Sequence, residues 1–285
     1  MFRDLLLWGT RRLSNSLSPR VESEILLSFA CNISRECLMR HTLLSTGSVS
    51  PIEVEKYKKL IAQRSEGYPV QYLVRTSGFY EHDILVGPGA LVPRPETEIL
   101  VQRVLTELCT TGTLIRSVWD LGTGTGCITL ALASRATDIE YLAVDKSNSA
   151  IQWAEKNLRH LRNVTIRKAD FTVDSDLLAL LSEFGPPDVV VANPPYLPQS
   201  VMHEKYEPYM ALCGGGPEGL DLLRAVARAS SIVLANSGLL FLEHLPDQSQ
   251  SLRVSLEAMG FCDIESFCDL NDRLRFSSAK IIRLD

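Results

Sequence analysis

The chain lacks several features that set special classes of protein apart. Its 285 residues contain no apolar stretch close to the roughly 20 residues needed to cross a bilayer. They contain no internal repeat and no low-complexity segment. The composition, with 45% hydrophobic and 22% charged residues, is that of an ordinary globular protein. We therefore expect no association with membranes, and a main domain accompanied by a smaller one.

A basic surface and paired cysteines are also missing. The net charge is −5 and the pI is near 5.6, so direct binding of nucleic acid is not expected. The seven cysteines form no CxxC pair, and histidines such as His82, His203 and His244 have no obvious metal partners. We predict no disulfide framework, no bound metal, and surface or packing roles for the histidines. Reduced thiols are typical of a cytoplasmic protein, which we expect to be monomeric.

The first twenty residues are rich in arginine and poor in acidic charge. Four arginines are opposed only by Asp4, and this composition superficially resembles an organelle presequence. We favour a first helix, because apolar residues recur along the segment and no dispensable linker separates it from the next helical pattern. These residues are Leu5, Leu6, Trp8, Leu13 and Leu17. A location in an organelle matrix is the alternative if the segment is a presequence.

Residues 1–75 carry helical periodicity and are predicted to form an N-terminal helical domain. Ser18-Pro19 and Ser50-Pro51 are both typical of helix starts, with proline in the first turn. Short alternating pieces follow, and Gly87-Pro88-Gly89 lies among them. This pattern predicts a β-hairpin connector over residues 76–92.

From residue 93 onward, strand-like runs alternate with helical stretches. The alternation predicts a doubly wound, mainly parallel α/β sheet over residues 93–285. Only Asn271-Asp272 separates the last two strand-like runs, which is too short for a crossover connection, so these runs should form an antiparallel hairpin. The runs are residues 117–121, 139–145, 163–169, 187–192, 237–243, 263–269 and 273–281.

A glycine-rich turn follows the first of these strands. Residues 120–127 read DLGTGTGC, and glycines at a strand-to-helix turn let the backbone approach a ligand closely. Asp145 ends the next strand, where a carboxylate can accept hydrogen bonds from ribose hydroxyls. Asp170-Phe171 ends the third strand, and this carboxylate and aromatic ring are suited to hold an adenine. The spacing predicts a nucleotide-like cofactor.

Two ligand classes compete for this layout. A nicotinamide dinucleotide requires the third glycine of GxGxxG, but Cys127 occupies that position. A strand-end Asp before a GxGxG turn instead resembles motif I of class I S-adenosylmethionine-dependent methyltransferases, whose acidic edge suits a cationic cofactor. We therefore favour S-adenosylmethionine, with S-adenosylhomocysteine as the product. The predicted cofactor-binding residues are Asp120, Gly122, Thr123, Gly124, Thr125, Gly126, Asp145, Asp170, Phe171 and Asn193.

A polar corner with two prolines follows the apolar run 189–192. Asn193-Pro194-Pro195-Tyr196 offers an amide oxygen and carbonyl acceptors, while the prolines bring no N–H donor to compete with a ligand. Such a corner can hold a planar NH2 group by both of its hydrogens, with Tyr196 as a flat face. The alternative is a buried strand that simply ends at prolines. The corner alone leaves both interpretations open.

The corner is similar to motif IV of methyltransferases that act on planar amino or amide nitrogens. Two further sequence blocks distinguish between the families of such enzymes. Residues 91–98 (LVPRPETE) and residues 207–221 resemble segments of the peptide-chain-release-factor glutamine methyltransferases. The resemblance extends through residues 67–80 and 270–273. It covers nearly the whole chain, most weakly in the first 65 residues.

The chain departs from the family pattern at three places on the substrate side. Residues 243–248 read EHLPDQ where the family tends to have EIG..Q, and Tyr209 and Met210 stand where Arg is usual. Residues 274–276 replace a more hydrophobic strand. Segment 94–98 has two interpretations, a helix start with acidic residues in its first turn and a wall of the cofactor pocket. Both can hold.

The resemblance implies a fold and a reaction. The fold is an N-terminal helical bundle, a hairpin connector and a seven-stranded Rossmann-like methyltransferase sheet. The reaction is methyl transfer from S-adenosylmethionine to the side-chain amide nitrogen (N5) of the glutamine in the GGQ motif of class I peptide chain release factors, which modulates translation termination. The release factor is therefore the expected partner, and the helical domain is expected to dock it.

The resemblance also implies roles for the corner residues, with Asn193, Pro194 and Tyr196 as catalytic residues. The Asn193 side-chain oxygen and the Pro194 carbonyl would each accept one N–H of the substrate amide, and these bonds strengthen as positive charge develops on the nitrogen. Tyr196 would pack against the amide plane and exclude water. Together with Pro195, these residues form the predicted substrate-binding set.

Three other functions are weighed against this one. N5-methylation of a ribosomal-protein glutamine uses the same corner chemistry and similar flanking blocks. Adenine-N6 methylation of DNA or RNA also presents a planar NH2 group, but it normally brings a basic recognition region. A non-catalytic cofactor-binding module is disfavoured because cofactor and acceptor motifs are both complete.

Overall fold

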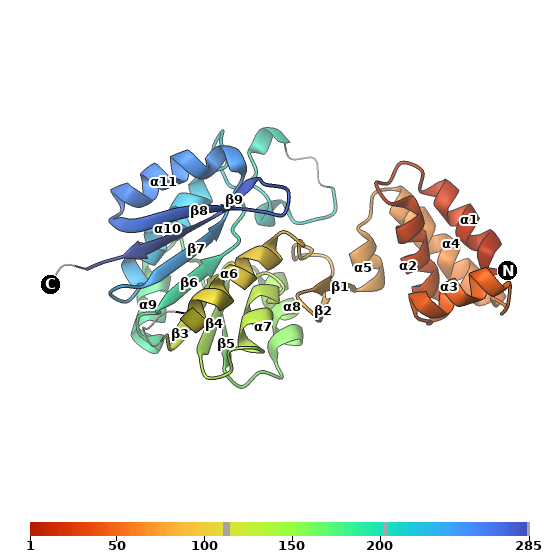
Figure 1. Ribbon diagram of the computed structural model, residues 1–285, viewed down its shortest axis with the longest axis horizontal. Coiled ribbons are helices and arrows are strands. Elements are labelled where there is room, and N and C mark those ends of the chain that lie inside the picture. Colours follow the sequence, from red (N-terminus) through yellow and green to blue (C-terminus); the bar gives the residue numbers. More distant parts are fainter. Residues whose placement is uncertain (111–114, 202–204, 284–285) are drawn as a thin grey trace. The chain divides into compact units, whose positions relative to one another are not determined.

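The computed structural model describes residues 1–110, 115–201 and 205–283 (Figure 1). The chain divides into two compact units, Met1–Thr76 and Ser77–Asp285. Each unit has a buried apolar core of its own. Within the described ranges, no helix is both long enough and apolar enough to span a membrane.

The first unit is helical, as the periodicity predicts. Its helices are α1 (Phe2–Arg12), α2 (Pro19–Cys31), α3 (Arg35–Leu44), α4 (Pro51–Ser65) and α5 (Val70–Val74). The helix starts predicted at Ser18-Pro19 and Ser50-Pro51 are confirmed. At the second, the Ser50 side chain accepts from the Glu53 backbone N–H and the Glu53 carboxylate accepts from the Ser50 N–H, which is a full capping box.

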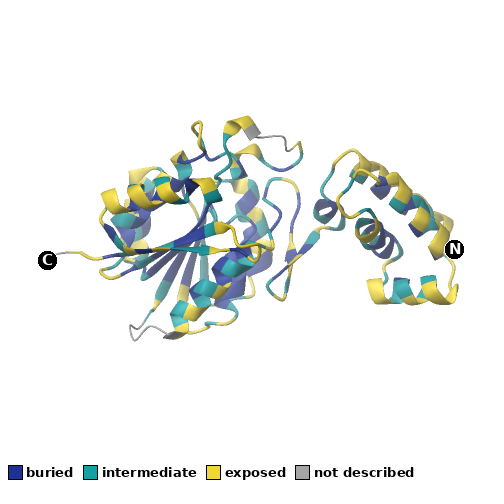
Figure 2. Cartoon of the chain, turned by 45° about the horizontal axis from the view of Figure 1, so that its top comes forward, coloured by how far each residue is buried: buried dark blue, intermediate teal, exposed yellow. Residues whose placement is uncertain are grey.

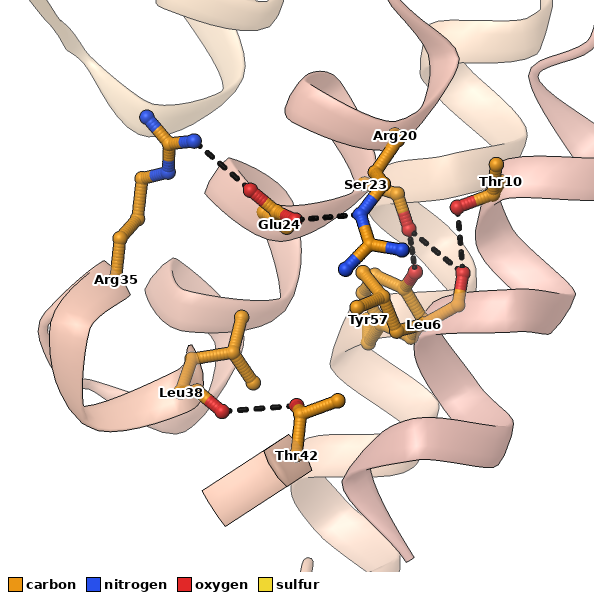
Figure 3. A network of polar contacts seen from close by, with 9 residues as sticks. All are labelled: Leu6, Thr10, Arg20, Ser23, Glu24, Arg35, Leu38, Thr42 and Tyr57. Carbon is orange, nitrogen blue, oxygen red and sulfur yellow. Dashed lines mark hydrogen bonds and ion pairs between the residues drawn. The ribbon is translucent and has the colours of Figure 1, made fainter. Parts of the chain in front are cut away.

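Buried polar contacts tie these helices together (Figure 3). The Ser23 hydroxyl lies 2.6 Å from the Tyr57 hydroxyl and donates to the Leu6 carbonyl, which links α1, α2 and α4. Gly9 is needed at this crossing, because a Cβ there would lie 1.8 Å from the Tyr57 oxygen. Glu24 is buried between two arginines of α2 and α3, and burial opposes its charge, but the hydrogen bonds they donate lower the Glu24 pKa.

The second unit begins with a hairpin and continues into one large sheet. The hairpin strands are β1 (Thr76–Phe79) and β2 (His82–Leu85), and a loop over residues 86–96 leads to α6. The sheet has seven strands in the order β5-β4-β3-β6-β7-β9-β8. They are β3 (Ser117–Leu121), β4 (Glu140–Asp145), β5 (Val164–Lys168), β6 (Val189–Ala192), β7 (Leu239–Glu243), β8 (Phe261–Cys268) and β9 (Leu274–Ile281).

The pairing directions confirm the predicted fold class. Strands β3 to β7 pair in parallel, whereas β9 runs antiparallel to both β7 and β8. The short connection at Asn271-Asp272 therefore closes an antiparallel hairpin, as its length requires. Because β4 and β6 flank β3, the strand order reverses beside the glycine turn that follows β3.

Helices cover both faces of the sheet, and its central strands are the most buried part of the second unit (Figure 2). Alternate residues of β3 point to opposite faces: Val118 packs with residues of α6, α7 and α8, and Trp119 packs with residues of α9, α10 and α11. The helices are α6 (Thr97–Thr110), α7 (Cys127–Ala133), α8 (Asn148–Leu158), α9 (Asp174–Phe184), α10 (Asp221–Val233) and α11 (Ser249–Ala258). Short 3-10 turns span η1 (Gln199–Val201), η2 (Tyr209–Ala211) and η3 (Pro246–Gln248).

Candidate active site

A cavity opens where the strand order reverses, at the carboxyl ends of β3, β4 and β6. This edge is where ligands bind in doubly wound folds, because all parallel strands end there. Among the predicted site residues, those lining the cavity are Gly122, Thr123, Gly124, Thr125, Asp145, Phe171, Asn193 and Pro195. Those that do not line it are Asp120, Gly126, Asp170, Pro194 and Tyr196.

The glycine turn after β3 forms one wall of the cavity. Gly122 and Gly124 have φ values of 82° and 58°, which side chains rarely tolerate. An added Cβ at either glycine would meet no atom closer than 3.9 Å, so both face open space. Gly126 also has a positive φ, 80°, and it has a second reason to be glycine, since its Cβ would lie 2.8 Å from Leu158 of α8. Two glycines thus leave room for a ligand and the third permits close helix packing.

Asp120 lies beneath this turn and holds it. The Thr123 and Thr129 hydroxyls both donate to its Oδ2 atom, at 2.7 Å each. Its Oδ1 atom is buried and has no hydrogen-bond partner among the described residues. Burial raises the pKa of Asp120 to about 6, although the two threonine hydrogen bonds oppose the shift. The sequence predicts a direct cofactor ligand here, whereas the structure has Asp120 bonded to the turn.

Asp145 lines the cavity at the end of β4. Its Oδ2 atom accepts from the Gly124 N–H at 2.9 Å and its Oδ1 atom accepts from the Ser147 N–H at 2.8 Å. Burial raises the pKa of this carboxyl group, while the backbone hydrogen bonds act in the opposite direction. Each carboxylate oxygen retains a lone pair for a further donor. The carboxylate can therefore accept hydrogen bonds from ligand hydroxyls.

After β5, the side chains of Phe171 and Asp170 point to different places. Phe171 lines the cavity and offers an apolar wall. Asp170 is turned to its own loop, where it accepts from the Thr172 hydroxyl at 2.6 Å and lies 3.5 Å from the Lys146 ammonium group. Burial opposes its ionisation, but these partners prevail and lower the Asp170 pKa. Of the predicted pair, Phe171 therefore reaches the cavity and Asp170 does not.

The polar corner after β6 brings Asn193 and Pro195 to the cavity, and the Asn193 side chain is held there in a fixed orientation. The Asn193 Nδ2 atom donates to the Thr97 hydroxyl at 3.0 Å. Thr97 is the first residue of α6, and its hydroxyl donates in turn to Glu243 Oε2 at 2.7 Å. Because the amide nitrogen is engaged with Thr97, the Asn193 side-chain oxygen is the atom left for the cavity. It can serve as a hydrogen-bond acceptor.

Tyr196 is held by the same buried carboxylate. Its hydroxyl donates to Glu243 Oε1 at 2.9 Å and accepts from an Arg275 N–H at 2.9 Å. Arg275 also pairs with Glu243 at 3.2 Å. Burial raises the pKa of Tyr196, and the nearby Glu243 charge adds to the shift. The corner therefore belongs to a network of five side chains. Glu243 and Arg275 are not predicted as site residues, whereas Thr97 lies in segment 94–98, one interpretation of which is a wall of the cofactor pocket.

Residues 214–219 and Gln248 contact the backbone of the corner at Tyr196. Gly214 and Gly219 pack directly on the backbone of Tyr196, where a Cβ would lie 2.7 Å from its Cα atom and 2.3 Å from its carbonyl oxygen, respectively. The Gln248 side-chain NH2 group donates to the Tyr196 carbonyl and to the Glu218 carbonyl, at 2.7 Å each. Gly214, Gly219 and Gln248 thus fix the position of the corner.

Segment 89–97 forms the opposite wall and is joined to the 205–222 loop. The buried Glu207 carboxylate accepts from the Val92 N–H at 3.0 Å and from Arg94 at 2.5 Å. Both interpretations of the PRPETE block therefore apply, because Thr97 begins α6 and segment 89–94 lines the cavity. Met210, one of the departures from the family pattern, lines the cavity as well.

Three of the described histidines, His41, His82 and His244, have side-chain hydrogen-bond partners in the fold. His244 is fully buried, with Nε2 at 2.8 Å from the Ser277 hydroxyl, and His82 Nε2 lies 3.0 Å from Ser134. His203 lies outside the described residues. No group of three or more metal-ligating side chains is found in the part of the chain that the structure describes.

A seven-stranded sheet of this order, with a glycine turn and a polar corner meeting at one cavity, defines the methyltransferase class of doubly wound proteins. The solved structure of the SeMet-substituted CurJ carbon methyltransferase has a similar fold, with a TM-score of 0.50 and 13% identity over 96% of this chain and 70% of that chain. Two family models match the chain. They are the PrmC N-terminal domain over residues 4–74 and the methyltransferase small domain over residues 95–210.

Curated relatives narrow this class to a family. The release factor glutamine methyltransferase of Xylella fastidiosa (strain 9a5c) is 35% identical over 263 residues, which cover 90% of this chain and 91% of the relative. That of Moorella thermoacetica is 34% identical over 252 residues, covering 85% and 84%. The chain belongs to the release factor glutamine methyltransferase family. Its methyltransferase domain implies the use of S-adenosylmethionine.

Proposed function

We propose that the chain transfers a methyl group from S-adenosylmethionine to the side-chain amide nitrogen of the glutamine in the GGQ motif of class I release factors. The observation that carries this proposal is the orientation of Asn193, whose side-chain oxygen is left for the cavity while its nitrogen is bonded to Thr97. A planar NH2 group needs an acceptor of this kind. The relatives named above carry the same activity in their names.

The cofactor half of the cavity suits an adenosyl group in its donor set. Asp145 would accept from the ribose hydroxyls, and Phe171 would cover the adenine ring. Because Gly122 and Gly124 have no side chains, the cofactor would be able to contact the backbone of the turn directly. Asp120 would act through the turn that it holds, since it bonds to Thr123 and Thr129. When bound, S-adenosylmethionine supplies a methyl group on a positively charged sulfur.

The acceptor half would orient a poor nucleophile. An amide nitrogen has its lone pair delocalised into the carbonyl group, so its position relative to the methyl group decides the rate. Asn193, which lines the cavity, would accept one N–H of the substrate, and this bond would strengthen as the new carbon–nitrogen bond forms and charge develops on the nitrogen. The Pro194 carbonyl remains the proposed acceptor of the other N–H, although Pro194 itself does not line the cavity. One of these protons then leaves to solvent, as the carbon–sulfur bond has broken. Tyr196 would limit the access of water.

The test uses the full chain with S-adenosylmethionine that carries a labelled methyl group. The acceptors are an intact class I release factor, its variant with alanine in place of the GGQ glutamine, a ribosomal-protein preparation and duplex DNA. We expect label on the intact release factor and none on the alanine variant. Equal labelling of the alanine variant, or label only on ribosomal protein or DNA, would contradict the proposal.

A further inference from the structure

A carboxylate at one end of the buried chain Glu243–Thr97–Asn193 sets the direction of every hydrogen bond in it. Glu243 is fully buried and Thr97 is 1% exposed, so neither side chain has water as an alternative partner. An ionised carboxylate can only accept. The Thr97 hydroxyl must therefore donate its one proton to Glu243, at 2.7 Å. Its remaining lone pairs can only accept, and the donor that meets them is the Asn193 NH2 group at 3.0 Å.

Glu243 is kept as an acceptor by its other partners. Its second oxygen accepts from the Tyr196 hydroxyl at 2.9 Å and from Arg275 at 3.2 Å. The guanidinium group cannot lose its charge and supplies donors only. Burial raises the pKa of this carboxyl group, while the three donors around it, one of them the charged Arg275 guanidinium, oppose the shift and favour the ionised form. A neutral side chain in its place would not impose the same direction on Thr97.

We propose that Thr97 and Glu243 are positioning residues that select which atom of the Asn193 amide faces the cavity. An asparagine amide has nearly the same shape in its two orientations, but one presents an acceptor and the other presents a donor. Only the acceptor orientation can hold a substrate NH2 group. The inference rests on the function proposed above. It adds to the polar corner two residues from other elements, Thr97 of α6 and Glu243 of β7.

Glu243→Gln is the sharpest test, because it changes the direction of the chain while nearly keeping its shape. The glutamine oxygen takes the side facing Tyr196 and Arg275, which both need an acceptor there. Its NH2 group then faces Thr97 and donates to it. Thr97 must in turn donate to Asn193, whose amide turns its nitrogen to the cavity. We expect turnover on release factor to fall by at least about 100-fold, as for other losses of substrate alignment.

A second pair of variants serves in case Glu243→Gln disturbs Arg275 or the fold. Thr97→Val keeps the shape of the side chain and removes the hydroxyl, whereas Thr97→Ser keeps the hydroxyl and removes the methyl group. We expect a loss in kcat near that of Glu243→Gln for valine and turnover within a few-fold of wild type for serine. Cofactor affinity, measured by titration calorimetry, should stay within a few-fold of wild type in both. A residue that served stability alone would not show rescue by serine.

A readout independent of activity follows the Asn193 side-chain NH2 signals by NMR, assigned by their loss in Asn193→Asp. In the wild type one of these two protons bonds to the buried Thr97 hydroxyl and should exchange slowly with water, whereas in Glu243→Gln the NH2 group faces the cavity and that slow exchange should be lost. Unchanged exchange together with near-wild-type turnover in Glu243→Gln and in Thr97→Val would overturn the inference. If the wild-type chain fails to methylate release factor, the proposed function fails, and the exchange rates still decide the orientation of Asn193.

Discussion

The two sides of the cavity are built in different ways. The cofactor side is made mostly of backbone, with Gly122 and Gly124 at positive φ and one carboxylate, Asp145 at the end of the neighbouring strand β4, which accepts from the Gly124 N–H. The acceptor side is made of side chains from four elements or loops, joined by buried hydrogen bonds between Thr97, Asn193 and Glu243. Local sequence dictates the first side, and tertiary packing dictates the second. Substitutions should therefore separate binding of cofactor from methyl transfer.

The largest expected effect is on the acceptor side. Asn193→Ala removes an acceptor at the place where positive charge develops, so turnover should fall by about 100- to 1000-fold. Cofactor affinity should stay within a few-fold, because the glycine turn and Asp145 are untouched. Steady-state kinetics and calorimetry measure the two quantities. Asn236→Ala, which removes an acceptor of the Arg283 N–H outside the cavity, is the control and should keep full turnover. Loss of cofactor binding in Asn193→Ala would break the comparison between the two sides.

The next effect concerns the buried charge beneath the cofactor side. Burial raises the pKa of Asp120 from 3.8 to about 6. The folded chain then binds this proton more tightly than the unfolded chain, so stability from the protonated group is lost as pH rises from about 4 to 6. The loss is about 3 kcal/mol in total and complete above about pH 6.

Denaturant unfolding of the wild type and of Asp120→Asn, without cofactor, between pH 4 and pH 7 measures this loss. The difference between the two free energies of unfolding cancels most other titrating groups. We expect it to change by about 3 kcal/mol across that range, with the wild type losing stability relative to the variant as pH rises. A difference that stays constant with pH would show that Asp120 titrates in its ordinary range.

The smallest effect is on the glycine turn. Gly124→Ala forces a side chain into the left-handed region, which costs about 1–2 kcal/mol of stability. The new Cβ faces the cavity, so cofactor affinity should fall by about 10-fold, close to 1.4 kcal/mol, with turnover at saturating cofactor little changed. Gly260→Ala is the matched control, since Gly260 also has positive φ and its Cβ would meet nothing within 4 Å. An equal loss of affinity in both variants would assign the effect to stability.

The difference between features set by local sequence and features set by tertiary packing explains what could be predicted from the sequence. The mainly parallel sheet, the terminal hairpin and the glycine turn follow from patterns over a few residues, and all three are confirmed, whereas the strand order is not predicted. Membership of the family was also foreseen, because its motifs are contiguous blocks. Of the two side chains proposed to orient Asn193, Thr97 lies in a segment that the sequence offers as a wall of the cofactor pocket, whereas Glu243 is not predicted as a site residue. Thr97 and Glu243 are 146 positions apart, and their contact depends on how α6 packs at the edge of β7.

Individual roles were harder to predict than positions. Asp120 lies near the end of β3 and Asp170 shortly after β5, as expected for ligands, yet one bonds to Thr123 and Thr129 and the other to Thr172. A carboxylate at a strand end can bind a ligand or its own loop, and the sequence does not distinguish these choices. Tyr196 is similar, since its hydroxyl is directed to Glu243. The roles of these residues in methyl transfer remain predictions.

The most direct test of the account is a double-mutant cycle on the acceptor side. Turnover on release factor is measured for the wild type, Thr97→Val, Asn193→Ala and the double variant, at saturating cofactor. If Thr97 acts through the orientation of Asn193, the double variant should be no slower than Asn193→Ala alone, since no amide is left to orient. Losses that multiply in the double variant would contradict the account, because they would mean that Thr97 and Asn193 contribute independently.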